Sequence, residues 1–181
     1  SGDRGKTTKH TYKLIRFAVD IMRAILKKHD SLRTPGNLSG FIPILGDAMV
    51  GGEDEVKISA FRLLAVIVKV PFVDDEGSKL YKVAVKEATK SISMAVSTTT
   101  DISQAALKML AVVLRDRRDV PVKDAAIDML LSKLKDDLTE PLYRHVTFNF
   151  LRSVLDRRLE SAAVFDTIDH VRTVMTINDY K

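Results

Sequence analysis

The chain has 181 residues, 45% of them hydrophobic and 29% charged, a composition that excludes an intrinsically disordered chain and supports one domain with its own core. It contains no cysteine, which excludes a disulfide framework and a thiolate metal site, and no apolar run approaches the roughly 20 residues of a membrane span. The net charge of +5 belongs to the start of the chain, because residues 1–33 hold nine Lys and Arg against three acids and the rest hold 20 against 21. Such a basic leader and first helix can attract phosphate, or can simply form a solvated surface.

Helices are predicted over eight stretches, and no stretch alternates polar and apolar residues for long enough to be a strand. In chain order they cover residues 8–28, 37–49, 55–70, 79–96, 101–117, 119–137, 139–157 and 161–175. Asn37 and Asp101 are the expected N-caps of the second and fifth helices. Pro71 ends the third helix, and Pro121 suits the first turn of the sixth, where a missing N–H is not needed. The helices therefore form four successive pairs, which predicts an all-α fold.

The first helices of the four pairs share one residue pattern, with offsets of 42, 46 and 41 residues between copies. A period in this range is typical of HEAT and armadillo arrays. The shared columns hold Val19, Phe61, Leu107 and Phe148; Ala18, Ala60, Ala106 and Thr147; Ile21, Leu63, Met109 and Phe150; Met22, Leu64, Leu110 and Leu151; Ile25, Ile67, Val113 and Val154; Leu26, Val68, Leu114 and Leu155; and the polar Asp20, Arg62, Lys108 and Asn149. This predicts a right-handed α-solenoid of about four HEAT-like helix pairs. Its repeats are expected over residues 8–50, 54–97, 101–137 and 139–177 of a single segment 1–181.

The ends of such an array need polar caps, because a lone helix pair cannot bury its hydrophobic face. The first and last pairs carry no obvious cap, so we expect exposed apolar surface at one or both ends. The chain begins with Ser rather than Met and shows no signal peptide, so we expect a processed chain or part of a much longer one.

Each apolar first helix ends in positive charge, which suggests candidate contacts to RNA or phosphate. The candidates are Lys27, Lys28, Arg115, Arg117, Arg118, Arg157 and Arg158. Cations at a helix C-terminus are also favourable by about 0.3–1 kcal/mol for electrostatic reasons alone, so helix-end charge explains the same residues. The low aromatic content of 6% and the absence of Trp argue against a platform for stacking bases.

No catalytic constellation is visible, and no cofactor, metal or enzymatic activity is predicted. The phosphate-binding glycine motifs and the HExxH zinc motif are absent. Asp166, Asp169 and His170 share a helix face and could hold a metal or act as a base, but a solvent-facing polar stripe is the more usual meaning of this spacing.

Two stretches resemble a known family. "HDSLRTPGNLSGFIPIL" (29–45) and "DEVKISAFRLLAVIVKVPF" (54–72) are similar to a late part of the very large HEAT-repeat scaffold of the small-subunit processome, the down-regulated-in-metastasis or U-three snoRNA-associated family. The likeness continues more weakly to about residue 155, and "STTTDISQ" (97–104) departs most from it.

The resemblance implies a non-catalytic scaffold fragment in the nucleolus that helps small-subunit pre-rRNA processing and particle assembly. It implies other processome proteins as partners, and pre-ribosomal RNA or snoRNA backbone as a further one, with no membrane and no small-molecule substrate. No site residue is carried over, because the family has no active-site motif.

Two alternatives share the predicted fold. A HEAT-repeat transport or trafficking adaptor would bind peptides, commonly through a ladder of Asn or Trp on its concave face, and no such ladder is visible. A helical-repeat enzyme acting on DNA bases would bring acids and aromatics together in a basic groove, whereas the aromatics here fall mostly in apolar helix columns.

Overall fold

The computed structural model describes residues 2–159 and 161–178, and over these residues it contains helices and no strand, which confirms the all-α prediction. The α-helices are α1 (Gly2–Lys28), α2 (Pro35–Leu38), α3 (Ile42–Gly51), α4 (Asp54–Val66), α5 (Glu76–Met94), α6 (Asp101–Asp116), α7 (Asp124–Leu134), α8 (Pro141–Asp156) and α9 (Ala162–Asn178). Short 3-10 turns lie at η1 (Asp30–Leu32), η2 (Ser39–Phe41) and η3 (Lys135–Thr139).

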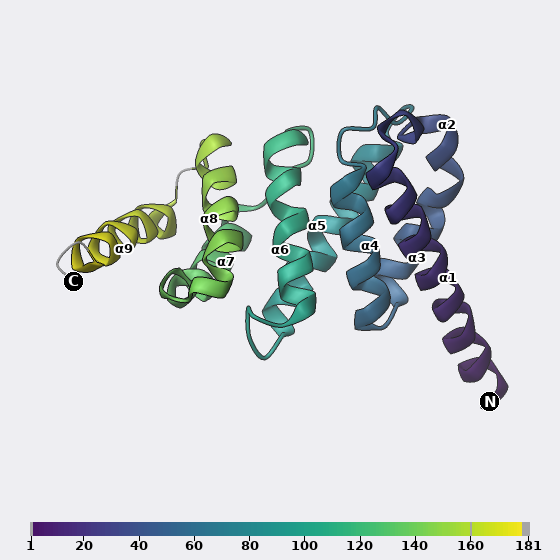
Figure 1. Ribbon diagram of the computed structural model, residues 1–181, viewed down its shortest axis with the longest axis horizontal. Coiled ribbons are helices and arrows are strands. Elements are labelled where there is room, and N and C mark those ends of the chain that lie inside the picture. Colours follow the sequence, from purple (N-terminus) through teal and green to yellow (C-terminus); the bar gives the residue numbers. More distant parts are fainter. Residues whose placement is uncertain (1, 160, 179–181) are drawn as a thin grey trace.

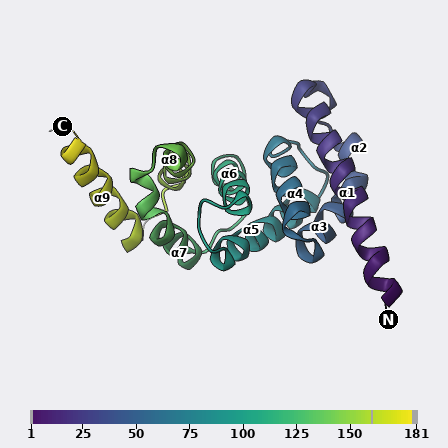
Figure 2. The same cartoon turned by 60° about the horizontal axis from the view of Figure 1, so that its bottom comes forward.

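The helices form two rows. α1, α4, α6 and α8 make the first row, in which each helix packs against the next (Figure 1). In the second row α5 packs against α3 and α7, and it also packs against α6 of the first row. Figure 2 shows the rows as a shallow arc with α3, α5 and α7 along its outer side and the two chain ends far apart.

Most of the predicted columns form the core between the rows. α4 and α6 have first-row neighbours on both sides, and their apolar columns are buried throughout. Phe61 and Leu107 are among the largest fully buried side chains, and Val19 of the same column is also buried. The fourth member, Phe148, departs from the pattern, because 38% of its surface is exposed.

The two end helices of the first row, α1 and α8, expose different apolar columns to solvent. On α1, Ile21 and Ile25 are 44% and 46% exposed. On α8 those columns are fully buried, and Phe148 and Leu155, 38% and 42% exposed, are open instead. The reason is that α1 packs on the first row only through α4, and α8 only through α6. The expected apolar surface is therefore present at both ends of the first row.

The predicted helix over 37–49 is divided into two helices. Thr34 is the N-cap of α2, since its Oγ1 accepts a hydrogen bond from the backbone N of Asn37 at 3.3 Å. The side chain of Asn37 instead donates to the carbonyl oxygen of Leu32 at 3.0 Å, so its prediction as a cap is wrong. Pro43 lies in the first turn of α3, where proline starts a helix without losing a hydrogen bond.

The cap predicted at Asp101 is also displaced by one residue. Thr100 is the N-cap of α6, and its Oγ1 accepts a hydrogen bond from the backbone N of Ser103 at 3.3 Å. Asp101 begins the helix itself, where its negative charge is favourable at the positive end of the helix dipole.

Candidate nucleic-acid interface

The cationic ends of the first-row helices lie along one edge of the molecule. α1, α4, α6 and α8 run in the same direction, so their C-terminal turns and following loops meet at the upper edge in Figure 1. A groove of about 290 Å³ that includes Arg33, Lys69 and Arg115 joins the ends of α4 and α6. Nη2 of Arg118 lies 3.3 Å from the carbonyl oxygen of Asp156, which joins the ends of α6 and α8. We call this line of helix ends the upper edge.

Arg117 is engaged within the protein. Its side chain is only 14% exposed, and its Nε and Nη2 donate to the two carboxylate oxygens of Asp119 at 3.0 and 2.8 Å. The guanidinium also lies over the ring of Tyr81, 5.1 Å from its centroid, which is a cation–π distance. Arg117 therefore holds the loop after α6 against α5, and its charge is already paired.

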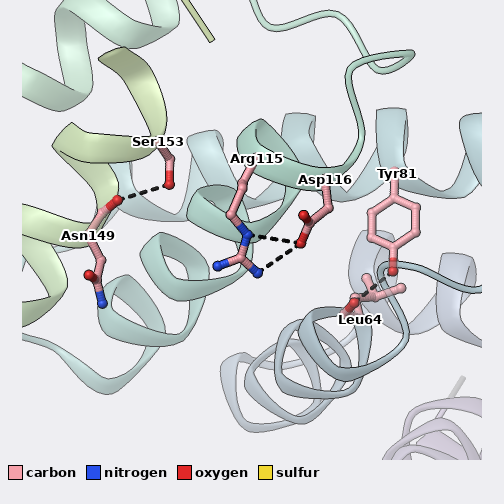
Figure 3. A network of polar contacts seen from close by, with 6 residues as sticks. All are labelled: Leu64, Tyr81, Arg115, Asp116, Asn149 and Ser153. Carbon is pink, nitrogen blue, oxygen red and sulfur yellow. Dashed lines mark hydrogen bonds and ion pairs between the residues drawn. The ribbon is translucent and has the colours of Figure 1, made fainter. Parts of the chain in front are cut away.

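Tyr81 is the buried anchor of this arrangement. Its hydroxyl donates to the carbonyl oxygen of Leu64 at 2.6 Å, in the last turn of α4 where carbonyls lack helical partners (Figure 3). Burial raises the pKa of the Tyr81 hydroxyl far above its ordinary value, while the charge of Arg117 lowers it to a smaller extent. The phenol is thus a neutral donor that joins α5 to α4.

We expect Tyr81→Phe to lower the free energy of unfolding by about 1–2 kcal/mol, because it leaves the carbonyl of Leu64 buried without its donor. Tyr143→Phe is the matched control, since no hydrogen bond of the half-buried Tyr143 hydroxyl is found among the described residues; it should cost under about 0.5 kcal/mol. Urea unfolding followed by circular dichroism measures both, and equal losses would contradict the role of the Tyr81 hydroxyl.

Arg157 is also engaged within the protein. Its Nη1 donates to the carbonyl oxygen of Arg117 at 3.3 Å, and its Nη2 donates to the carbonyl oxygen of Val120. Burial lowers the pKa of the Arg157 guanidinium, and the nearby charge of Arg118 adds to this effect. Arg157 therefore fastens the end of α8 to the loop after α6.

The other candidates remain exposed on the upper edge: Lys27, Lys28, Arg115, Arg118 and Arg158. Arg115 donates through Nε and Nη2 to Oδ2 of Asp116 at 3.1 and 2.8 Å, so part of its charge is offset (Figure 3). That hydrogen bond raises the pKa of the Arg115 guanidinium above its ordinary value. Arg158 follows the C-terminus of α8 in the left-handed region, with φ of 58°, and its backbone N donates to the carbonyl of Leu155 at 2.9 Å.

The structure shows two further basic surfaces that the sequence analysis does not predict. A second groove of about 290 Å³ lies between α6 and α8, beside the hydrogen bond from Ser153 to the Asn149 carbonyl in Figure 3. Its lining includes Lys108, Arg115, His145 and Arg152. The outer side of α5 carries exposed lysines at Lys79, Lys82, Lys86 and Lys90. Their spacing of three and four residues is visible in the sequence, but these lysines lie in the middle of a helix, whereas the predicted contacts all lie at helix ends.

Asp166, Asp169 and His170, which the sequence also offers as a possible metal or base site, lie on α9. Among residues 2–159 and 161–178, no three or more His, Cys, Asp or Glu side chains come together as a metal site would require. In the same part of the chain, none of the helices has the length and apolar character to cross a membrane.

Comparison with known proteins gives two relatives, while no protein-family model matches the chain. The chain is similar to U3 small nucleolar RNA-associated protein 20 of Schizosaccharomyces pombe, with 33% identity over 169 residues, and to the Saccharomyces cerevisiae protein of the same name, with 31% over 168. Each match covers 93% of this chain but only 7% of the relative. The resemblance noted in the sequence is therefore confirmed, over a longer stretch than residues 29–155.

Proposed function

Because this chain is homologous to a short segment of U3 small nucleolar RNA-associated protein 20, we propose that it is a non-catalytic scaffold segment of a ribosome-assembly factor. It would act in the nucleolus, helping small-subunit pre-rRNA processing and particle assembly by holding other processome proteins and the RNA backbone. Neither relative is named as a transport adaptor or an enzyme, and no observation favours those alternatives.

The proposed architecture is a right-handed α-solenoid of about four HEAT-like pairs, with repeats over 8–50, 54–97, 101–137 and 139–177. Three features support it. The first-row helices follow one another along the row in chain order, and their residue patterns are offset by 41–46 residues. In the chain, a helix of the second row comes between each first-row helix and the next. Helical repeats of this kind form extended surfaces suited to holding partners.

The observation that carries the scaffold proposal is the opposite exposure of the two end helices. Ile21 and Ile25 are open on α1, and their counterparts on α8 are buried against α6. Phe148 and Leu155 are open on α8, and their counterparts on α1 are buried. Each end therefore presents the face on which another helix of the same pattern would pack, as expected of one stretch of a longer array.

The open face of α1 also has the shape that such packing needs. An apolar groove of about 590 Å³ runs along it, between α1 and the turns that follow. The groove is lined by Phe17, Ala18, Ile21, Met22, Ile25, Leu26, Leu32, Asn37, Leu38 and Phe41. Burying a large aliphatic side chain stabilises by about 1.5–3 kcal/mol, so a neighbouring repeat would gain substantially by covering this groove.

The proposal is tested in the longer protein to which this segment is proposed to belong. We expect Ile21→Asp with Ile25→Asp to prevent the protein from co-sedimenting with U3 RNA in large particles, because charges would enter the interface between repeats. Ile44→Asp is the matched control, since Ile44 is 40% exposed on α3, away from the groove. Unchanged co-sedimentation of the double variant would overturn the scaffold proposal.

A further inference from the structure

The outer face of α5 carries a straight line of lysines. Lys79, Lys82, Lys86 and Lys90 follow one another at intervals of three, four and four residues, and all are exposed. At 3.6 residues per turn they fall within about 80° of one another around the helix, over a length of about 16 Å. Among the described residues, no hydrogen bond or ion pair of their ammonium groups is found. We call these four residues the lysine ladder.

The acids of α5 do not neutralise the ladder. Glu87, the only acid beyond the first turn of the helix, is buried, and its Oε2 lies 3.9 Å from Nζ of Lys57 on α4. Glu76 stands in the first turn, next to the acidic loop that precedes the helix, so it marks one end of the ladder. The outward face is therefore cationic along its length, because the interior acid points into the protein.

A fifth cation lies at the other end of the ladder. Nζ of Lys133, on α7, donates to the carbonyl oxygen of Ser93 at 3.3 Å, one turn beyond Lys90. This position is favourable for a cation because the C-terminus of α5 carries partial negative charge. The positive surface thus continues from α5 to α7 along the outer row seen in Figure 2.

The chemistry of the ladder fits a phosphate backbone better than a peptide. Lysine acts as a flexible point charge without the planar fork that arginine uses for bidentate recognition. Between Lys79 and Lys90 no large apolar side chain is exposed that could anchor a peptide, and the exposed Met94 and Val96 lie beyond the last lysine of the ladder. Backbone phosphates are bound through charge neutralisation of this kind, independent of base sequence.

We propose that the lysine ladder of α5 is a binding site for the sugar-phosphate backbone of single-stranded RNA, an inference that rests on the proposed function. It places the RNA on the outer row, whereas the candidates recognised from the sequence lie on the upper edge. The site selects for phosphate charge and for no particular base.

The test measures binding of a fluorescently labelled, mixed-sequence single-stranded RNA to the 181-residue chain over a range of salt concentrations. Replacing all four ladder lysines with glutamine should reduce the slope of log affinity against log salt by about 3, since each phosphate contact contributes about 0.7. At low salt the affinity should fall by at least about tenfold. Replacing the same four lysines with arginine keeps the charge and should preserve binding.

A competing-site variant removes four exposed lysines from the upper edge and the first row, by changing Lys27, Lys28, Lys69 and Lys108 to glutamine. It changes the net charge by the same amount as the ladder variant, so a smaller loss of slope would show that the position of the lysines, and not the net charge, decides the binding. If the competing-site variant loses binding and the ladder variant keeps it, the RNA lies on the first row or upper edge, which overturns this inference and leaves the scaffold proposal standing.

Two further outcomes would overturn the inference. The wild-type chain could fail to bind RNA at low salt, or the ladder variant could lose binding to poly-glutamate while binding RNA normally, which would assign the ladder to an acidic protein. Thermal unfolding by circular dichroism should be the same for all variants, because the substituted side chains are exposed. The co-sedimentation experiment above reports separately on the scaffold proposal.

Discussion

Phe61→Ala should lower the free energy of unfolding by about 3–5 kcal/mol, the range expected for truncating a fully buried phenylalanine. Phe61 is fully buried on α4, which packs against both α1 and α6. Removing the ring takes away its transfer free energy and leaves a cavity that the neighbouring helices can close only in part. Urea unfolding, with the slope as a check on two-state behaviour, measures the loss.

Phe148→Ala is the matched control, because Phe148 holds the same column position on α8. Since 38% of its surface remains exposed, its loss should cost only about 1–2 kcal/mol. Equal losses at the two positions would contradict the open end of the first row. Repeating the measurement at two protein concentrations would then detect a second copy covering Phe148, because stability that depends on association rises with concentration.

Arg157→Met should lower the free energy of unfolding by about 1.5–3 kcal/mol, although Arg157 lies at a helix end that the sequence presents as a charged surface. Methionine keeps much of the aliphatic stem but removes both donors, so the carbonyl oxygens of Arg117 and Val120 lose their charged partner. These bonds connect residues 40 and 37 positions apart, so their loss should loosen the end of α8 from the loop after α6. Thermal unfolding and hydrogen exchange at that loop measure the effect.

Arg158→Met is the control for Arg157, since Arg158 is the next residue, carries the same charge and is exposed. Its substitution should change stability by less than about 0.5 kcal/mol. A second comparison uses RNA binding, in which neither substitution should approach the effect of the ladder variant. Similar stability losses for the two arginines would show that helix-end charge, and not the two hydrogen bonds, accounts for Arg157.

For the seven candidate residues, the sequence predicts the position at a helix end but not the partners of each side chain. Their position at helix ends could be read from the sequence, because a helix terminus is marked within a few residues of itself. Whether an arginine faces solvent or a carbonyl from the preceding pair depends on residues about 40 positions away. Arg157 is engaged by carbonyl oxygens 40 and 37 positions away, which no local signal could show. Arg117 lies over the ring of Tyr81 on α5 but also pairs with Asp119, two positions away, whereas Lys27, Lys28 and Arg158 are exposed.

By itself the sequence determined the all-α fold, the columns that repeat along the first-row helices, and the resemblance to the U3-associated relatives. These features are local, since a period of 3.6 residues and the recurrence of a pattern can both be read along the chain. Only the tertiary structure decided which copy of a column is buried: Phe61 and Phe148 have the same side chain in the same register, but α4 has a first-row neighbour on each side and α8 has one. Burial depends on which residues are neighbours in space. The same holds for the hydrogen bonds of Arg157 and for the exposure of the lysine ladder on the outer row.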